Sequence, residues 1–207
     1  MKNSFRKLNQ SEQIQMSETL ARAFMNHDNF VYLIEDETKR VKAASLLFQF
    51  MTKVMNRYGY IYVVYEQGSP IGYITFMDDN TEKLGVKTVL KSNALWKAMR
   101  FWLFISSHER KKYKAYMKKY NEINHQVKNA IHLYYTGIEA EYRGQGFMKK
   151  AMDDALSYFS KKGYKLVQLE TSDKSNVGLY KHLGYQVIQS VKTTDERQEI
   201  FFFEKHF

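Results

Sequence analysis

A glycine turn in the second half of the sequence has the composition of a phosphate-binding site. Arg143-Gly144-Gln145-Gly146 follows an apolar run and opens an amphipathic stretch at residues 146–162. Glycine lets the backbone turn sharply and approach a ligand closely, and the first N–H groups of a helix have no partner within that helix. Together with the positive end of the helix dipole, these groups favour a ligand that carries phosphate.

A second segment, residues 171–185, places two polar side chains on one face of a helix. Asn176 and Tyr180 are four residues apart in a helical stretch that follows an apolar strand. Residues at this spacing lie on the same side of a helix, so both side chains face whatever lies beside it. The segment is therefore the second candidate part of a binding or catalytic site.

The glycine turn does not match the common nucleotide-binding motifs. It lacks the Lys and Ser or Thr that end a Walker loop, and it lacks the third glycine of the dinucleotide fingerprint. Residues 143–148 instead resemble the Arg/Gln-x-x-Gly-x-Gly/Ala motif of the GNAT family of N-acetyltransferases, and Asn176-x-x-x-Tyr180-x-x-x-Gly184 resembles a second motif of that family. Met148 stands where the family has a small residue, so either the loop opens slightly or this side chain points away from the cofactor.

The resemblance implies that the protein transfers the acetyl group of acetyl-CoA directly to a primary amine of a small molecule or peptide. It implies that Tyr180 protonates the CoA thiolate and that Asn176 contacts the pantetheine arm. A phenol with a pKa of about 10 is neutral at pH 7 and can donate to sulfur. The residues expected to bind acetyl-CoA, mostly through their main chains, are Ile138, Arg143, Gly144, Gln145, Gly146, Phe147, Met148 and Asn176.

Two further features follow from the same resemblance. The fourth and fifth strands are expected to splay apart, so that an N–H near Gly137 or Ile138 faces the thioester oxygen. Lys149 or Lys150, in the first turn of the following helix, is expected to neutralise the ribose phosphate of the cofactor.

The base that removes a proton from the amine is less well defined by the sequence. Glu139, at the end of the fourth strand, is the predicted base, and Glu141 and Glu170 are the alternatives. Such a carboxylate needs burial to raise its pKa, which the sequence does not show. A bridging water, or an acceptor that arrives deprotonated, would replace a dedicated base. His132 is predicted to be a core histidine, too far back along its strand to react.

In the GNAT family, the segment between the first two helices lines the acceptor pocket. The corresponding candidates here are Phe24, His27, Asp28, Phe30 and Tyr32. Packing in the core or between helices is the favoured interpretation of their aromatic side chains. Acceptors in the family range from small amines, polyamines and amine-bearing antibiotics to protein N-termini and lysines, and the sequence does not choose among them.

Hydrophobic periodicity predicts the elements that must position these residues. Strands are predicted at residues 5–8, 60–65, 71–76, 130–138, 166–170, 185–191 and 199–204, and helices at 11–25, 38–57, 146–162 and 175–182. This order matches an α/β GNAT fold in one domain over residues 1–207, with a mixed, mostly antiparallel central sheet of about seven strands flanked by helices. Residues 81–128 are predicted to be an insertion of one to three helices between the third and fourth strands. Within it, the run at residues 96–105 is predicted to pack over the acceptor side of the sheet, with a membrane-surface helix as the alternative. Strict alternation along the fourth strand puts His132, Tyr134, Thr136 and Ile138 on one face.

Composition excludes several classes of protein. The chain has 207 residues, of which 44% are apolar, enough to bury a sizeable core. It has no cysteine, which removes disulfides, thiolate metal sites and a cysteine nucleophile, and its six histidines show no metal-ligand spacing, so no metal is expected. There is no apolar N-terminal run and no long apolar segment, so we expect a cytoplasmic protein without a membrane span.

Positive charge is concentrated in the predicted insertion. The net charge is +10, and residues 81–130 contain 12 Lys or Arg against three acidic residues. Such a cluster indicates an acidic partner, an anionic membrane, a nucleic acid or a solvated helix face. The alternatives to an enzyme are thus a non-catalytic acyl-CoA sensor, which the pair Asn176 and Tyr180 argues against, and a nucleic-acid-binding protein. The insertion has no recognised RNA- or DNA-binding motif, so no nucleic-acid partner is expected, and a homodimer is left open.

Overall fold

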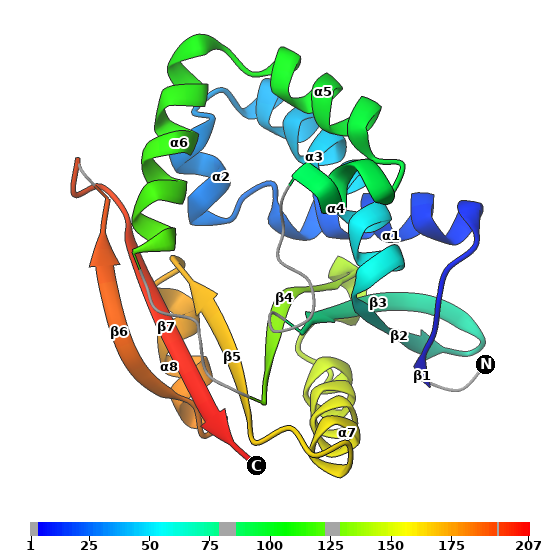
Figure 1. The fold of residues 1–207 in the computed structure, drawn as a ribbon. Coiled ribbons are helices and arrows are strands. Elements are labelled where there is room, and N and C mark those ends of the chain that lie inside the picture. Colours follow the sequence, from blue (N-terminus) through cyan, green and yellow to red (C-terminus); the bar gives the residue numbers. More distant parts are fainter. Residues whose placement is uncertain (1–3, 79–85, 123–128, 194) are drawn as a thin grey trace.

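A seven-stranded mixed sheet forms the centre of the molecule (Figure 1). The computed structural model describes residues 4–78, 86–122, 129–193 and 195–207. The strands run in the order β1-β2-β3-β4-β5-β7-β6, and β4 and β5 are the parallel pair among otherwise antiparallel neighbours. Their bounds are Ser4–Phe5 (β1), Tyr60–Glu66 (β2), Ser69–Met77 (β3), Ala130–Ile138 (β4), Leu166–Thr171 (β5), Gln186–Lys192 (β6) and Glu199–His206 (β7). The predicted fold class is confirmed.

The helices near the N-terminus begin where the sequence supplies capping side chains. Asn9 and Glu12 form a capping box at the start of α1, and the Asp36 carboxylate accepts a hydrogen bond from the N–H of Lys39 at the start of α3. A short helix, α2, occupies the connection that the sequence predicted only as a break. The bounds are Gln10–Phe24 (α1), Asp28–Leu33 (α2) and Glu37–Tyr58 (α3).

Three helices lie between β3 and β4, within the predicted range of one to three. They are Val86–Lys91 (α4), Leu95–Phe104 (α5) and Ser107–Asn121 (α6). The ends of the predicted insertion, residues 79–85 and 123–128, lie outside the described residues. Two more helices, Phe147–Lys161 (α7) and Ser175–His182 (α8), follow β4 and β5 as predicted, and a single turn at Ala140–Tyr142 precedes α7.

The helices cover both faces of the sheet. Side chains of α7 and α8 pack with β4, β5 and β7 on one face, around the fully buried Phe159 and Phe203. On the other face α1 and α3 cover β2, β3 and part of β4, around Phe48. On that second face α6 covers β7, where Tyr116 packs with Ile200 and Phe202. Helix α6 therefore lies over the sheet. The run at residues 96–105, predicted to pack over the acceptor side of the sheet, forms most of α5 and packs on α3 instead, so that prediction was wrong (Figure 1).

A bulge in β4 changes which side chains share a face. Thr75 pairs with Tyr135 and Phe76 pairs with Leu133, so Tyr134 is an extra residue in the strand. Leu133 and Ile138 consequently pack together on the α7 face. Strict alternation had separated these two residues and put Ile138 with His132 and Tyr134, so that prediction was wrong. The one extra residue is the physical reason, because it reverses the orientation of every side chain after it.

The residues beyond the bulge therefore face α1 and α3. The Tyr135 ring packs against Phe24 and Phe48, with ring centroids 5.7 and 5.2 Å apart. Gly137 lies so close to α1 that an added Cβ would stand 2.7 Å from Leu20 Cδ2. The end of β4 is thus held firmly against α1.

β4 and β5 separate after only four paired residues. Their register runs from Ala130 opposite Leu166 to Leu133 opposite Leu169, while β4 continues to Ile138 along β3. The diverging ends of β4 and β5 are visible in Figure 1. Over residues 134–138, the edge of β4 that faces β5 has no described strand partner, so its backbone groups are available to a ligand. Among the described helices, none combines the length and apolar character that crossing a membrane requires.

Candidate active site

The glycine turn between β4 and α7 has the geometry of an anion-binding loop. Gly144 and Gly146 have φ angles of +74° and +82°, and an added Cβ at either residue would meet nothing within 4 Å. Gly146 is the N-cap of α7, and among the described residues no side chain caps this helix, so its first N–H groups have no side-chain partner there. Arg143 is exposed and makes no ion pair with a described residue. This part of the chain therefore fits a pyrophosphate.

The bulky residues that follow the turn point away from it. Phe147 and Met148 are half-buried and pack against the core cluster beneath α7. Of the two arrangements expected for Met148, the structure shows the one in which its side chain leaves the loop. Lys149 pairs with Asp153 at 3.3 Å on the exposed side of α7.

Tyr180 lies beside the end of β5, on the α8 face of the sheet. Asp173 starts this helix by accepting a hydrogen bond from the N–H of Ser175 at 2.9 Å. The Tyr180 ring packs between Tyr185 and Phe203, with centroid distances of 5.7 and 5.4 Å. Burial, followed by the negative charge of Glu170 and of Asp173, raises the pKa of Tyr180 to about 12. The phenol therefore keeps its proton at neutral pH, and it makes no hydrogen bond to a described residue.

Glu139 is engaged in an ion pair at the end of β4. Its carboxylate accepts hydrogen bonds from Arg22 Nη2 at 2.7 Å and Thr19 Oγ1 at 2.5 Å, both on α1. The hydrogen bond from Arg22 is the main cause that holds the pKa of Glu139 below its ordinary value. A carboxylate with a lowered pKa accepts a proton poorly. The hypothesis that Glu139 is the base stays a prediction, and this ion pair counts against it, while Glu141 is exposed.

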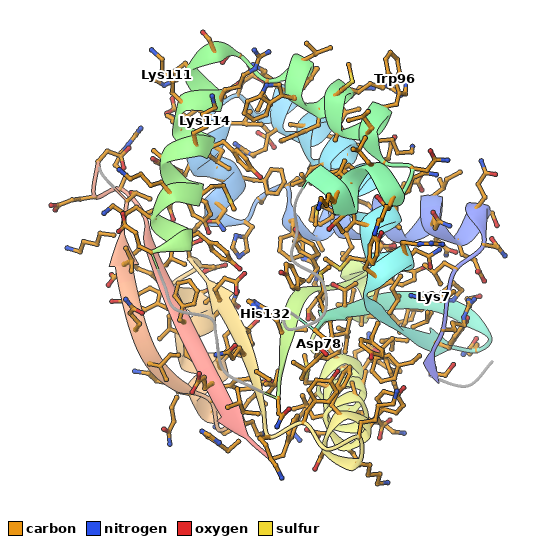
Figure 2. The ribbon with its side chains drawn as sticks, in the orientation of Figure 1. Lys7, Asp78, Trp96, Lys111, Lys114 and His132 are labelled. Carbon is orange, nitrogen blue, oxygen red and sulfur yellow. The ribbon has the colours of Figure 1, made fainter. Side chains whose placement is uncertain are left out.

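Glu170 and His132 meet where β4 and β5 separate. His132 Nε2 contacts the carboxylate of Glu170, and the hydroxyl of Tyr120 on α6 donates to the same carboxylate at 2.9 Å. His132 is buried, as predicted, and lies between the two strands in the middle of the molecule (Figure 2). It is nevertheless in contact with a candidate base, which its position along the strand did not suggest.

The parallel pairing of β4 and β5 would have predicted the contact between His132 and Glu170. His132 lies opposite Gln168, and Glu170 follows Gln168 by two residues on the same face of β5. Recognising the pair from the sequence required the register of β4 and β5. Tyr120 had no such signal, because its position depends on how α6 packs over the sheet.

A second cluster of hydrogen-bonded polar side chains lies on the α6 side of the site. The hydroxyl of Ser172, just after β5, contacts Asn29 Oδ1, and Asn29 Nδ2 donates to the hydroxyl of Tyr116 at 3.0 Å. Helix α2 is thereby tied to the end of β5 and to α6. Burial lowers the pKa of the neighbouring His27, so its imidazole is held neutral.

The residues proposed for the acceptor pocket mostly pack against other side chains. Phe24 and Phe30 lie against Phe48 in the core, which confirms the packing interpretation for both. The hydroxyl of Tyr32 hydrogen-bonds Asp195 in the β6–β7 turn at 3.1 Å. For His27, burial lowers the pKa and the negative charge of Asp173, next to α8, acts in the opposite direction, so His27 lies near that end of the site.

Comparison with known proteins agrees with this geometry. The model of the acetyltransferase (GNAT) family matches residues 15–185. A search of curated proteins found no significant relative.

Many solved structures share the fold. One is a structure of histone acetyltransferase HPA2 and related acetyltransferase from Corynebacterium glutamicum, at 15% identity and a TM-score of 0.63, covering 99% of this chain and 96% of that chain. PaiA N-acetyltransferase from Thermoplasma acidophilum, solved in complex with coenzyme A, is 13% identical with a TM-score of 0.58 over the whole of both chains. A polyamine N-acetyltransferase from Drosophila melanogaster, which forms N-acetylagmatine, is 11% identical with a TM-score of 0.58, again over both whole chains. At such low sequence identities, the structural similarity shows a shared fold and nothing more.

Proposed function

Because the chain belongs to the GNAT acetyltransferase family and is an acyltransferase, we propose that it transfers the acetyl group of acetyl-CoA directly to a primary amine. One observation carries this proposal. The glycine turn at Gly144 and Gly146 leads along an open edge of β4 to the strand separation, where Glu170 lies close enough for its charge to act on Tyr180.

Acetyl-CoA, when bound, supplies the thioester whose acetyl group is transferred. Residues 143–148 would hold its pyrophosphate through their N–H groups, and the main chain of Ile138 would hold the pantetheine arm, which Asn176 would contact from α8. The complex of a similar protein with coenzyme A supports this choice of cofactor. Arg143, which has no carboxylate partner among the described residues, would add a positive charge beside the phosphates.

Tyr180 would give its proton to the sulfur as the C–S bond breaks. Three features support this role: its spacing from Asn176, its place at the end of β5, and a pKa of about 12 that keeps the phenol protonated. Its ring is fixed by Tyr185 and Phe203, so the hydroxyl has a defined direction.

Glu170 would accept the proton that the amine loses as the new C–N bond forms. Its carboxylate is oriented by His132 and Tyr120 and lies at the strand separation. Glu139 is less suited to this role because its ion pair with Arg22 holds its pKa below the ordinary value. The products are the acetylated amine and free CoA, and Glu170 and Tyr180 return to their starting states by exchanging protons with solvent.

Calorimetric titration with acetyl-CoA and with CoA tests the cofactor half of the proposal. Wild type is compared with Gly146→Glu, which puts a negative side chain into the loop. Gly163→Glu is a matched control, since Gly163 also has a positive φ, +89°, and nothing within 4 Å of an added Cβ, but it follows the far end of α7. The backbone strain of the two variants is therefore alike.

We expect wild type and Gly163→Glu to bind both ligands, and Gly146→Glu to bind neither. Gly146→Glu should not bind because its new carboxylate repels the phosphates of the ligand in a loop that otherwise offers N–H groups. Absence of binding by folded wild type would overturn the proposed function. Equal binding by all three proteins would overturn the assignment of the loop.

A further inference from the structure

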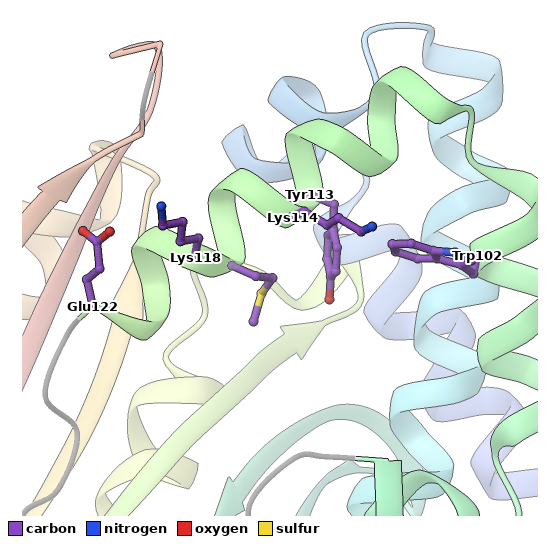
Figure 3. Close-up of a pocket in the computed structure, with 6 residues that line it drawn as sticks. Trp102, Tyr113, Lys114, Lys118 and Glu122 are labelled. Atoms are coloured by element: carbon purple, nitrogen blue, oxygen red, sulfur yellow. The ribbon is translucent and has the colours of Figure 1, made fainter.

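Helices α5 and α6 border an open surface pocket that the proposed reaction has not used. Its volume is about 440 Å³, and it is lined by Trp102, Tyr113, Lys114, Met117, Lys118 and Glu122 (Figure 3). A second cavity of about 380 Å³ shares Trp102 and Tyr113 with it and is otherwise lined by apolar side chains of α3 and α5. We call the first of these the α5–α6 pocket. It combines flat aromatic walls with ammonium groups.

The positive charge of this pocket is not compensated. Lys114 and Lys118 are exposed, and neither has a carboxylate within ion-pair distance among the described residues. Glu122, the acidic residue of the lining, pairs with Lys119 at 2.9 Å. By contrast, Lys112 on the same helix is buried and paired with a carboxylate. Two lysines of α6 that have no described carboxylate partner therefore line the pocket, while the exposed Lys111 of the same helix lies outside it.

The Trp102 ring has two positively charged groups next to it, those of Lys114 and Arg110. The ammonium of Lys114 lies 5.8 Å from its ring centroid and the guanidinium of Arg110 lies 5.6 Å from it. In Figure 3 the Lys114 side chain extends from α6 toward Trp102. An aromatic or apolar group stacked on Trp102 would thus have a positive charge at its edge.

The same helix connects the pocket to the reaction centre. Tyr113, Tyr116 and Tyr120 recur at intervals of three and four residues, so they lie along one side of α6. Tyr113 lines the pocket and points toward β4 (Figure 3), whereas Tyr120 donates a hydrogen bond to Glu170. Seven residues of helix span only about 10 Å. Burial, followed by the electrostatic effect of Tyr113, raises the pKa of Tyr135 on β4, so the two phenols are within electrostatic range of each other.

We propose that the α5–α6 pocket binds the acceptor, and that this acceptor is an amine carrying an anionic group, a carboxylate or a phosphate, on an aromatic or apolar body. The inference rests on the proposed function. The anionic group pairs with Lys114 and Lys118, the body lies on Trp102 and Tyr113, and the amine extends toward Glu170. A polycationic amine is repelled by the same two lysines.

Fluorescence of Trp102 tests binding without any chemistry. The chain has two tryptophans, and Trp96 is 68% exposed at the outer end of α5 (Figure 2), so Trp96→Phe leaves Trp102 as the single reporter. The probes are para-aminomethylbenzoate, para-aminomethylphenylphosphonate and benzylamine. All three carry an aminomethyl group on a benzene ring, and only the first two carry an anionic group. Each is titrated in the presence of CoA and in its absence.

We expect at least one anionic probe to bind about tenfold more tightly than benzylamine, because a hydrogen bond between two charged groups contributes about that factor. The double variant Lys114→Gln/Lys118→Gln should lose this preference. Lys111→Gln is the matched control, since Lys111 is an exposed lysine of the same helix outside the pocket (Figure 2). The two anionic probes distinguish a carboxylate-bearing acceptor from a phosphate-bearing one.

Steady-state rates with acetyl-CoA complete the test. The preferred anionic probe should show a kcat/KM about tenfold above that of benzylamine, and the double variant should raise its KM about tenfold without changing that of benzylamine. Equal binding of the three probes, or an equal loss for every acceptor in the double variant, would overturn the inference. Failure of the proposed function is separate, since it would appear as missing acetyl-CoA binding while the Trp102 signal remains readable.

Discussion

Replacing Tyr180 with Phe removes one oxygen atom and leaves the packing intact. The ring contacts of Tyr180 with Tyr185 and Phe203 are made by carbon atoms, and the hydroxyl makes no hydrogen bond to a described residue. The variant should therefore fold and bind acetyl-CoA like the wild type. If Tyr180 is the proton donor, the whole effect falls on the chemical step.

The size of the effect follows from the state of the phenol. With a pKa of about 12, Tyr180 is fully protonated at neutral pH, so every molecule of wild type can donate. Positioned proton transfer contributes about 100- to 10,000-fold to a rate, and kcat should fall by that factor, or about 3–5 kcal/mol of activation free energy. Because this pKa is raised, the donor is lost only as the pH rises toward 12, and Tyr180 adds no descending limb to the wild-type profile between about pH 7 and 10.

Steady-state kinetics with a saturating amine and acetyl-CoA measure this loss. Tyr185→Phe is the matched control, because Tyr185 is a buried neighbouring tyrosine whose hydroxyl has no hydrogen-bond partner in the described part of the chain. It should keep its kcat and be as stable as wild type or more so, since a buried unsatisfied hydroxyl is removed. A Tyr180→Phe enzyme whose kcat stays within about threefold of wild type, or an equal loss in Tyr185→Phe, would refute the role of Tyr180 as acid.

Three more results are expected from the same structure. Glu170→Gln should lower kcat about 100-fold or more at unchanged acetyl-CoA affinity, and near-normal turnover would exclude it as the base. Glu139→Gln should keep its kcat. It should lose up to about 1 kcal/mol of stability at pH 7, because it loses the ion pair with Arg22, whose side chain is about half exposed. Since the pKa of Glu139 is lowered in the folded protein, this difference in urea unfolding should shrink as the pH falls below the ordinary value of 4.5 and vanish once the pH is below the lowered pKa. A difference that persists at still lower pH would contradict the ion-pair explanation. Gly137→Ala should cost about 1–3 kcal/mol in the same assay, because the new Cβ would stand 2.7 Å from Leu20 Cδ2, and unchanged stability would show that α1 shifts freely.

Features encoded by neighbouring residues were predicted well from the sequence. The glycine turn, the start of α7 and the shared face of Asn176 and Tyr180 depend on backbone geometry within a few residues, and all three have the expected local structure. The order of strands and helices also follows from local periodicity, so the fold class could be predicted with them.

Contacts between distant parts of the chain could not be predicted in this way. The bulge at Tyr134 depends on how β4 pairs with β3, and it decides that Tyr135 and Gly137 face α1. Glu139 has the same sequence context whether it is a free base or an ion-pair partner, and only the packing of α1 brings Arg22 to it.

The sequence alone therefore indicated a phosphate loop, a tyrosine on the facing helix and the family to which both motifs belong. The tertiary structure decided that Glu139 pairs with Arg22 and that Glu170 meets His132 and Tyr120. Tyr120 and Glu170 are 50 residues apart along the chain and meet only because α6 packs across β5 and β7. Local spacing carries no information on such a contact, since it depends on which apolar faces of separate elements bury one another.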